Sequence, residues 1–385
     1  MQTDKTLFFY TIILIFIGIL FSYSLTTYTT LRLELNQFHF FIRQFIVAMI
    51  SVYLIWQISK LNPDKYLKII GFTLFFSSFF LMAAMHVLPS SVITEVGGAK
   101  RWIKLGIISI APVEFFKIGF IYFLAWSFSR KIEHNKPLLE EFKIFAPYLA
   151  AFLVVIYLIA VLQNDLGQVI VLGVTLAVMA FLAGSSFRFF TVIILSSVAV
   201  FIIAIITSAH RIARVKMWWA NIQNFVLSFL PEDFAKFLRI NETQDLMQIT
   251  NSLNAIKHGK IFGEGLGNSS FKLGFLSEIH TDFVLSGIAE EIGIISVIAI
   301  VVIFFLMTYR IFKISARSEN KTFFLFSAGV GLCLISSFLM NSFGITSLTP
   351  IKGIAVPFIS YGGSSLLANS IAVGMVLMLS KRVKL

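Results

Sequence analysis

The stretch FLSEIHTDFVLSGIAEEIG (275–293) decides the fold, because in it a polar segment passes directly into a long apolar run. His280, Thr281 and Asp282 stand at the border, and Glu290 and Glu291 follow about two helical turns further in. An apolar run of this length is typical of a membrane-spanning helix. An acidic side chain inside a membrane costs a few kcal/mol unless it is paired or reaches water. These carboxylates therefore need either a partner or a function.

The composition places the rest of the chain in a membrane as well. Of the 385 residues, 58% are hydrophobic, 15% aromatic and only 13% charged. Soluble globular proteins carry about 25% charged residues, so this composition excludes a soluble domain. The single cysteine, Cys333, excludes an internal disulfide.

Apolar runs of about 20 residues, the length of helix that crosses a bilayer, occur about ten times. We therefore predict an all-α integral membrane protein in which residues 1–385 form a single polytopic domain. The first run is long for a secretory signal and further spans follow it, so we expect an uncleaved first helix. The runs lie near 7–25, 39–58, 68–88, 112–128, 145–162, 167–185, 189–208, 282–307, 323–341 and 361–380.

The lysines and arginines of the short loops predict the orientation. If the N-terminus is inside, the inner loops carry many more of them than the short outer loops, as the positive-inside rule requires. We therefore expect both termini inside and an even number of spans. Topology accounts for much of the net charge of +12, and no nucleic acid is needed to explain it.

One outer connection, 209–281, is much longer than the others and lies between the seventh and eighth runs. It contains many basic residues, among them Arg211 and Arg214, and the adjacent Trp218 and Trp219. The apolar spacing in 225–230 and 246–256 predicts short amphipathic helices on the outer membrane surface. The basic residues could attract lipid headgroups or receive a lipid that carries phosphates, and the residues alone leave both open.

Polar residues in or beside the spans gather on the outer side of the membrane. A transporter with alternating access is expected to place such groups near the midplane, so this pattern favours chemistry at the outer surface. Two of the residues, spaced i and i+3 at the start of the fourth span, can neutralise each other. The set is Arg101, Glu114, Lys117, Asp165, Asp282 and Lys352.

Four of these residues also have a purely structural explanation. Asp282 could cap the eighth span, since Asp is a favoured N-cap residue. Glu114 and Lys117 could form a buried structural pair. Asp165 could position its loop or bind a substrate amide.

The acidic pair and the glycine run further along the chain are equally open. Glu290 lies about 80° around the helix from Asp282, so we expect it on the cavity side, with Glu291 nearly opposite; alternatively, the pair fixes helix packing. The run G-E-G-L-G (263–267) predicts a turn, because no strand–helix unit of a phosphate loop surrounds it. The stretch 360–365 predicts a tight turn with small-residue helix packing, because no base is paired with its serines.

Several motifs together resemble the SEDS family of bacterial cell-wall proteins, in the family's order and over nearly the whole chain. Two positions depart from the family pattern: Asn164 stands where proline is usual, and Gly344 is displaced by one from the usual Asn-x-Gly after Asn341. The motifs are GAKRW (98–102) with P-x-E-x-x-K (112–117), QNDLG (163–167), EIHTDF (278–283) with AEEIG (289–293), and PFISYGGSS (357–365).

This resemblance implies a peptidoglycan glycosyltransferase that polymerises lipid II, an undecaprenyl-diphosphate-linked disaccharide-pentapeptide, outside the bacterial cytoplasmic (inner) membrane. GEGLGNS (263–269), KLGFL (272–276) and PIKG (350–353) are more similar to the division members than to the elongation members, which usually lack a lysine at the position of Lys352. The implied partners are a class B penicillin-binding protein, which is a transpeptidase, and other membrane proteins of the division septum.

The implied reaction is one inverting displacement, from an α-linked diphosphate donor to a β-1,4 product. It needs one base for the acceptor hydroxyl and cations for the departing diphosphate. Asp282 is the expected base, although a divalent cation, Mg²⁺ or Mn²⁺, bridging Asp282 and the diphosphate fits equally well. The expected substrate-binding residues are Arg101, Lys117, Lys352, Glu114, Arg211, Arg214, Asp165 and Glu290.

Two functions of other classes stay open. A flippase that carries lipid II across the membrane predicts polar groups distributed through the bilayer. A non-catalytic scaffold for a division complex predicts that Asp282 tolerates substitution.

Overall fold

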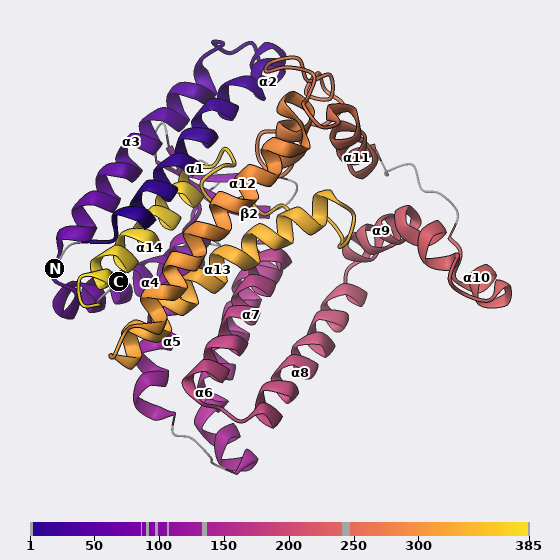
Figure 1. Cartoon of the computed structure of the whole chain (residues 1–385). Coiled ribbons are helices and arrows are strands. Elements are labelled where there is room, and N and C mark those ends of the chain that lie inside the picture. Colours follow the sequence, from indigo (N-terminus) through magenta and orange to yellow (C-terminus); the bar gives the residue numbers. More distant parts are fainter. Residues whose placement is uncertain are drawn as a thin grey trace.

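The computed structural model describes residues 3–85, 87–89, 92–96, 99–105, 108–132, 137–240 and 247–383. Gly98 of the GAKRW motif and Leu246 of an expected interfacial helix lie outside these ranges. The chain is mainly helical, which confirms the predicted fold class (Figure 1). In chain order the elements are α1 (Lys5–Ser24), α2 (Thr27–Arg32), α3 (His39–Lys60), α4 (Pro63–Ala84), β1 (Ile93–Val96), β2 (Ala99–Leu105), β3 (Ile108–Ile110), α5 (Pro112–Lys131), α6 (Leu138–Ile156), the π-helical η1 (Tyr157–Leu162), α7 (Leu166–Ala183), α8 (Phe187–Ile206), α9 (Ala209–Leu227), α10 (Glu232–Leu238), α11 (Met247–Gly259), α12 (Val284–Ala316), α13 (Lys321–Ile345) and α14 (Gly363–Ser380).

In the described part of the chain, eight helical stretches are long and apolar enough to cross a membrane: α1, α3, α4, α6 with η1, α7, α12, α13 and α14. The two other expected spans, 112–128 and 189–208, fall on α5 and α8, and the described apolar part of α8 is Phe187–Val200. The helix α5 carries two buried charged side chains and packs against α4, α7, α13 and α14. Because other helices cover it, its surface does not need to be as apolar as that of a lipid-facing span.

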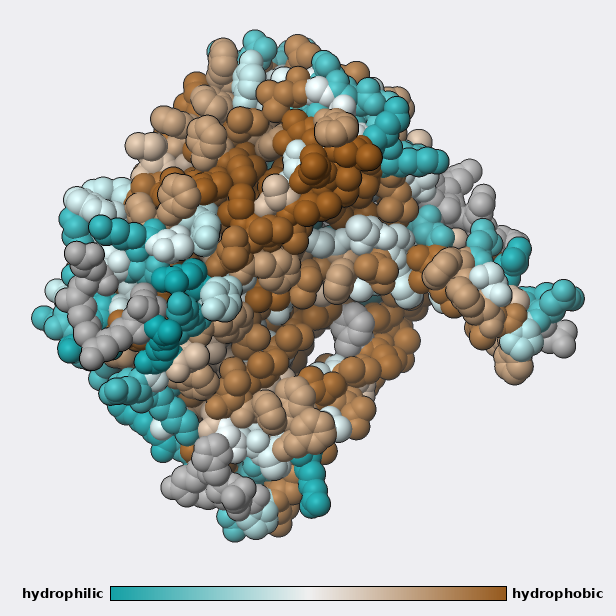
Figure 2. All heavy atoms as spheres, in the orientation of Figure 1, coloured by the Kyte–Doolittle hydropathy of each residue, from teal (hydrophilic) through white to brown (hydrophobic). Residues whose placement is uncertain are grey.

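The two termini lie side by side at one end of the helices (Figure 1). The Asp4 backbone N–H donates to Ser380 Oγ at 3.1 Å, and the Asp4 carboxylate pairs with Arg310 at 2.6 Å. This arrangement agrees with the even number of spans that the loop charges predict. Figure 2 shows hydrophobic residues over the middle of the visible face and hydrophilic ones gathered toward its ends, as burial in a bilayer requires.

A small antiparallel sheet in the order β1-β2-β3 lies between α4 and α5. The sequence did not predict it, since its strands are short and stand beside much longer apolar runs. Ser364, at the start of α14, holds the sheet's edge: its hydroxyl donates to Ser109 O at 3.2 Å and accepts from Ala111 N at 2.9 Å. Through β3 the sheet thereby joins β2, which carries Arg101, to the start of α14.

The helices α9 and α10 project from the helical bundle (Figure 1). Trp219 Nε1 donates to Leu238 O at 2.8 Å, which ties the two helices together. Phe229 and Phe237 are 74% and 86% exposed. The projecting arm therefore offers an apolar surface beyond the body of the protein.

Candidate active site

The carboxylate of Asp282 faces the loop that precedes the last helix. A Cβ atom on Gly353 would lie 2.8 Å from Asp282 Oδ2, so a side chain at residue 353 would displace the carboxylate. Asn341 on α13 joins the two segments, since its Nδ2 donates to the carbonyl of Asp282 at 2.6 Å and to that of Ile354 at 2.8 Å. The carboxylate is thus placed by contacts that converge from α13 and from the loop 350–354.

Asp282 does not cap the helix that it precedes. The N-cap residue of α12 is Phe283, and no side chain in the described ranges makes a capping hydrogen bond there. The segment is held instead by Ser360, whose hydroxyl donates to Thr281 O at 2.6 Å. The structural explanation that the sequence allowed for Asp282 is therefore wrong.

Arg101 binds the connection between η1 and α7. Its Nε donates to Gln163 O at 2.9 Å and a terminal nitrogen donates to Asn164 O at 2.7 Å. Its other terminal nitrogen lies 3.9 Å from Asp165 Oδ2. Asp165 in turn caps α7 by accepting from Gln168 N at 3.3 Å. Arg101 and Asp165 hold this loop in shape, and the Arg101 side chain remains 27% exposed.

The helix α9 brings two further arginines, Arg211 and Arg214, to the same end of the bundle. A terminal nitrogen of Arg211 donates to Ala160 O in η1 at 2.6 Å. One turn beyond Arg214, Trp218 Nε1 donates to Ser347 O at 2.9 Å. These two bonds attach α9 to η1 and to the loop after α13.

The surroundings of Asp282 raise its affinity for a proton. Burial, followed by the negative charges of Glu278 and Asp165, raises the pKa of Asp282 to about 7. The positive charges of Arg101 and Arg214 act in the opposite direction but are outweighed. A carboxyl group with a pKa near neutral pH is well matched to take up a proton during catalysis.

Lys352 lies beside the start of α7, where a Cβ atom on Gly167 would be 3.2 Å from Lys352 Cβ. Burial, followed by the positive charges of Arg214 and Arg211, lowers the pKa of Lys352 to about 8. An anion that binds here would reduce the electrostatic repulsion between Lys352 and the two arginines. We call the whole group the outer cluster: Asp282, Asp165, Arg101, Arg211, Arg214 and Lys352.

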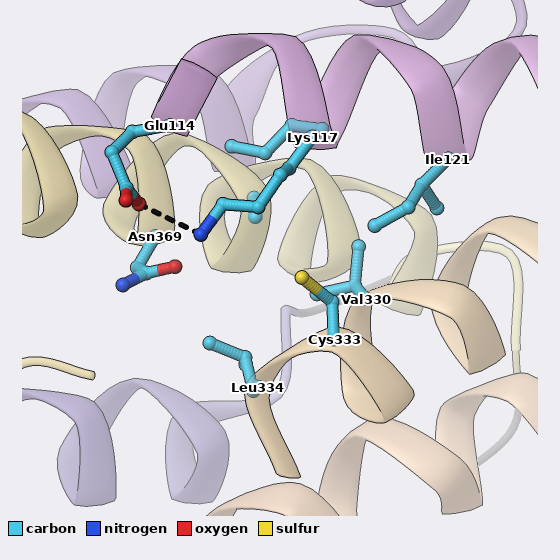
Figure 3. A pocket seen from close by; sticks show the side chains of 9 residues that line it. Glu114, Lys117, Ile121, Val330, Cys333, Leu334 and Asn369 are labelled. Atoms are coloured by element: carbon cyan, nitrogen blue, oxygen red, sulfur yellow. Dashed lines mark ion pairs between the residues drawn. The ribbon is translucent and has the colours of Figure 1, made fainter. Parts of the chain in front are cut away.

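Glu114 and Lys117, expected to touch substrate, are buried in the helical core instead. Lys117 Nζ lies 2.9 Å from Glu114 Oε2, and the two side chains are only 6% and 11% exposed. Gln168 Nε2 donates to the other Glu114 oxygen at 2.8 Å, which links the pair to the start of α7. Figure 3 shows both side chains extending from one helix toward Cys333 and Asn369.

The cavity beside this pair measures about 10 Å³. It has room for about one water molecule, and neither a sugar nor a diphosphate would fit. Substrate contact by Glu114 and Lys117 is therefore corrected to a supporting role: through Gln168 they hold the helix that carries Asp165.

Replacing Lys117 by methionine should destabilise the protein strongly, because Glu114 would keep a buried charge without its cation. Breaking a buried pair in this way costs about 3–5 kcal/mol. Thermal unfolding of the purified protein in detergent measures the effect. The double variant Lys117→Met/Glu114→Gln removes both charges and should recover much of the loss; equal stability of the single and double variants would contradict the buried pair.

Glu290 does not face a cavity, because its side chain is 0% exposed. Its carboxylate accepts from Ser270 N at 2.8 Å and from the Ser269 hydroxyl, and it lies 3.1 Å from His258 Nδ1. These partners come from the connection that precedes α12. The expectation that Glu290 binds substrate is wrong, because that connection covers the helix face on which Glu290 lies.

The expected divalent cation has no ready-made set of ligands. Within the described ranges, no three His, Cys, Asp or Glu side chains come together to hold a metal ion. Mg²⁺ and Mn²⁺ bind groups of oxygen ligands, and the charges that act on Asp282 are mixed: the carboxylates of Glu278 and Asp165 and the cations of Arg101 and Arg214. A cation bridging Asp282 and a diphosphate would therefore take most of its ligands from the substrate.

Three residues of the site were missed or underrated from the sequence. Asn341 and Gly353 appeared only as parts of motifs, and their contacts with Asp282 depend on the packing of distant segments. Gln163 is fully buried, and neither the oxygen nor the nitrogen of its side-chain amide has a hydrogen-bond partner among the described residues. Asn164 has a φ of 50°, which proline cannot adopt because its ring fixes φ near −65°. The departure from the proline of the resembling family thus has a backbone cause.

Comparison with known proteins gives full-length matches. A family model described as a cell cycle protein, FTSW_RODA_SPOVE, matches residues 5–385. A probable peptidoglycan glycosyltransferase FtsW of Helicobacter pylori is 46% identical over 387 residues, covering 100% of both chains. Its counterpart in Haemophilus influenzae is 31% identical, covering 97% of this chain and 89% of that one.

Two solved structures share the fold. A chain from a structure described as "Structural coordination of polymerization and crosslinking by a peptidoglycan synthase complex" matches with a TM-score of 0.73 at 22% identity, covering 99% of this chain and 98% of that one. The rod shape determining protein RodA of Thermus thermophilus matches with a TM-score of 0.67 at 20% identity, covering 100% and 99%. With a family model over nearly all of its length and a relative 46% identical from end to end, this multi-pass membrane protein belongs to the FtsW/RodA/SpoVE family of cell cycle proteins.

Proposed function

We propose that the protein is a peptidoglycan glycosyltransferase that polymerises lipid II into β-1,4 glycan strands at the outer face of the cytoplasmic membrane. The observation that carries this proposal is the outer cluster: a carboxylate that caps no helix, with a pKa of about 7, lies among arginines and a lysine. The names of the relatives, probable peptidoglycan glycosyltransferases FtsW, support the same activity.

The reaction assigns one role to the carboxylate and another to the cations. Asp282 takes the proton of the acceptor's 4-hydroxyl, and that oxygen forms a bond to the anomeric carbon of the donor sugar. The bond from this carbon to the diphosphate breaks, and the diphosphate leaves with the electron pair. The positive groups stabilise the negative charge of the leaving diphosphate, so no carboxylic acid is needed to protonate it. We assign this role to Lys352, Arg214 and Arg101, with Arg211 beside them.

The cellular role that we propose is synthesis of septal wall during cell division. The relatives carry the division name FtsW, whereas the elongation protein RodA is similar in fold at lower identity. A class B penicillin-binding protein is the proposed partner, and the likeness to a chain of a peptidoglycan synthase complex supports it. We further infer that α5 and α8 also cross the membrane, that both termini are cytoplasmic, and that 209–281 lies outside, with α9 and α10 in contact with the lipid surface.

The experiment that tests this function is polymerisation of labelled lipid II by the purified protein, with and without its transpeptidase. A flippase needs polar groups along a path through the bilayer. The polar residues here gather at one end, and the Glu114–Lys117 pair beneath them is closed in by packing. These features support catalysis at the outer face rather than transport.

The rate of polymerisation should depend on pH as a bell-shaped curve. Asp282 must be deprotonated to act as a base, so kcat/KM should rise as the pH increases through about 7. Lys352 must be charged to meet the diphosphate, so kcat/KM should fall above about 8. Initial rates across this range measure both limbs. Lys352→Arg keeps a positive charge at all these pH values and should remove the alkaline fall; an unchanged fall would exclude Lys352 as its origin.

A further inference from the structure

The helix α12 is broken within its apolar run. Gly293 has φ 82° and ψ 168°, which lie outside the helical region. In an unbroken α-helix, the amides of Ile294 and Ile295 would donate to the carbonyls of Glu290 and Glu291, four residues earlier. The break removes both bonds, and lipid offers no water to replace them.

A segment from the long outer connection replaces the lost bonds. The amides of Glu264 and Gly265 donate to the carbonyls of Glu290 and Glu291, both at 2.9 Å. In return, the amides of residues 294 and 295 donate to the carbonyls of residues 260 and 261, at 3.0 and 3.4 Å. The segment 260–265 is therefore inserted into the hydrogen-bond ladder of α12.

Close approach requires two glycines at this junction: Gly293 and the first glycine of G-E-G-L-G. A Cβ atom on Gly293 would lie 2.1 Å from Ile261 O, and one on Gly263 would lie 2.3 Å from Glu291 O. Gly263 also has φ 81°, in the left-handed region that favours glycine. The run is confirmed as a turn, and its first glycine permits the close approach to the broken helix.

Side chains reinforce the same junction through two carboxylates that are 0% exposed. Glu290 is held by Ser269, Ser270 and His258, as described above. Glu291 pairs with Lys272 at 2.9 Å.

The Glu291–Lys272 pair also reaches the first helix. The hydroxyl of Ser24, at the end of α1, donates to Glu291 Oε1 and Oε2 at 2.7 and 2.5 Å. Lys272 Nζ also donates to Ser24 O at 3.2 Å. Residues 258–272, which we call the clasp, therefore bind the outer half of α12 through its backbone and through both buried carboxylates.

We propose that the clasp fixes the outer half of α12 and thereby positions Asp282, with Glu290 and Glu291 as positioning residues. The outer half, 284–292, begins two residues after Asp282 and ends at the two carboxylates. A break at Gly293 uncouples this half from the membrane-spanning half, so its orientation depends on what holds it from outside. This proposal rests on the proposed function, because it concerns the residue assigned there as the base.

The first test replaces Glu290 by glutamine, which keeps the shape but removes the negative charge that holds the clasp. We expect kcat to fall about 10- to 100-fold with little change in KM, because misplacement of a reacting group lowers the rate of the chemical step. We also expect the acid limb of the pH profile to move to lower pH, since a loosened segment admits water and lets the pKa of Asp282 fall from about 7 toward its ordinary value. Glu264→Gln is the matched control, because it makes the same change at an exposed side chain of the same segment.

The second test restores the position by a covalent bond. Ser252 on α11 and Ser286 in the outer half of α12 face each other, with their hydroxyl oxygens 2.8 Å apart and both side chains buried. Cysteines at both positions can form a disulfide, whose sulfur atoms lie about 2.05 Å apart. The oxidised double-cysteine protein should be as active as its reduced form. In the Glu290→Gln background, oxidation should restore kcat and return the acid limb to its original pH.

Several results would overturn the proposal. In one, Glu290→Gln has the same rate and pH profile as Glu264→Gln. In another, Glu290→Gln loses activity, but the acid limb of its pH profile does not move and oxidation of the double-cysteine protein in this background does not restore kcat. Loss of activity on oxidation of the double-cysteine protein alone would show that the outer half must move during turnover.

If Glu290→Gln does not fold, Ser269→Ala, which removes one donor to the same carboxylate, takes its place in both tests. If the unaltered protein makes no glycan, the proposed function fails. The clasp is then tested by the rate at which a thiol reagent labels a Thr281→Cys variant, with and without Glu290→Gln. Equal rates of labelling in the two proteins would refute the clasp.

Discussion

Asp282→Asn should yield a folded, membrane-inserted protein that makes no detectable glycan from lipid II. Asparagine has nearly the shape of aspartate, and Asp282 caps no helix, so the fold loses little. The amide cannot take the acceptor's proton, and loss of positioned base catalysis costs about 10²- to 10⁴-fold in rate. The measurement is the initial rate of polymerisation, with thermal unfolding and binding of the transpeptidase as checks on folding.

Glu278→Gln is the matched control for this variant, because Glu278 is an exposed carboxylate four residues earlier in the same segment. Above pH 7 it should polymerise lipid II at close to the normal rate, whereas its acid limb should move to lower pH, because the charge of Glu278 helps to raise the pKa of Asp282. Glu291, which the sequence marked as lying on the far face of the helix, cannot serve, because it is buried against Lys272. Near-normal polymer from well-folded Asp282→Asn would remove Asp282 as the base and return attention to Asp165.

Lys352→Ala should lower kcat about 10²- to 10³-fold, the loss that follows removal of one group that stabilises developing negative charge. Lys352 tests the role of the cations directly, because burial and the positive charges of Arg214 and Arg211 lower its pKa to about 8. Arg101→Ala should cost a similar factor in rate and some stability too, since Arg101 also binds the carbonyls of Gln163 and Asn164. Both losses are measured as kcat at saturating lipid II, beside the thermal unfolding temperature.

Arg101→Lys separates the two roles of Arg101. A lysine keeps the charge but cannot reach both carbonyls with a planar fork, so it should restore more of the rate than of the stability. Full activity in both Arg101→Ala and Lys352→Ala would eliminate the outer cluster as the place where the diphosphate leaves.

The membrane spans and the position of Asp282 could be predicted from the sequence because both depend on local patterns. An apolar run long enough to cross a bilayer forms a helix, since its backbone has no other partners in lipid. Polar residues at the ends of such runs then lie at a membrane surface, where residues from different spans can meet. Asp282, Lys352 and Arg101 were found in this way, and the structure brings their charges into one cluster.

The partners of Glu114, Lys117, Glu290 and Glu291 could not be predicted, because they come from distant parts of the chain. A helical spacing shows that Glu114 and Lys117 share a face, but not that α7 and α14 cover that face. The break at Gly293 could not be predicted for the same reason. The apolar run continues through it, and the segment that supplies the missing hydrogen bonds lies about 30 residues earlier.

The most direct test of the whole interpretation is polymerisation of labelled lipid II by the purified protein, alone and with a class B penicillin-binding protein whose transpeptidase serine has been replaced. We expect a ladder of glycan strands that lysozyme digests, formed by the unaltered protein with its partner and absent with Asp282→Asn. Equal amounts of polymer from both proteins would contradict the role of Asp282. Absence of polymer from the unaltered protein, with lipid II crossing vesicles that contain it, would contradict the glycosyltransferase and favour a flippase.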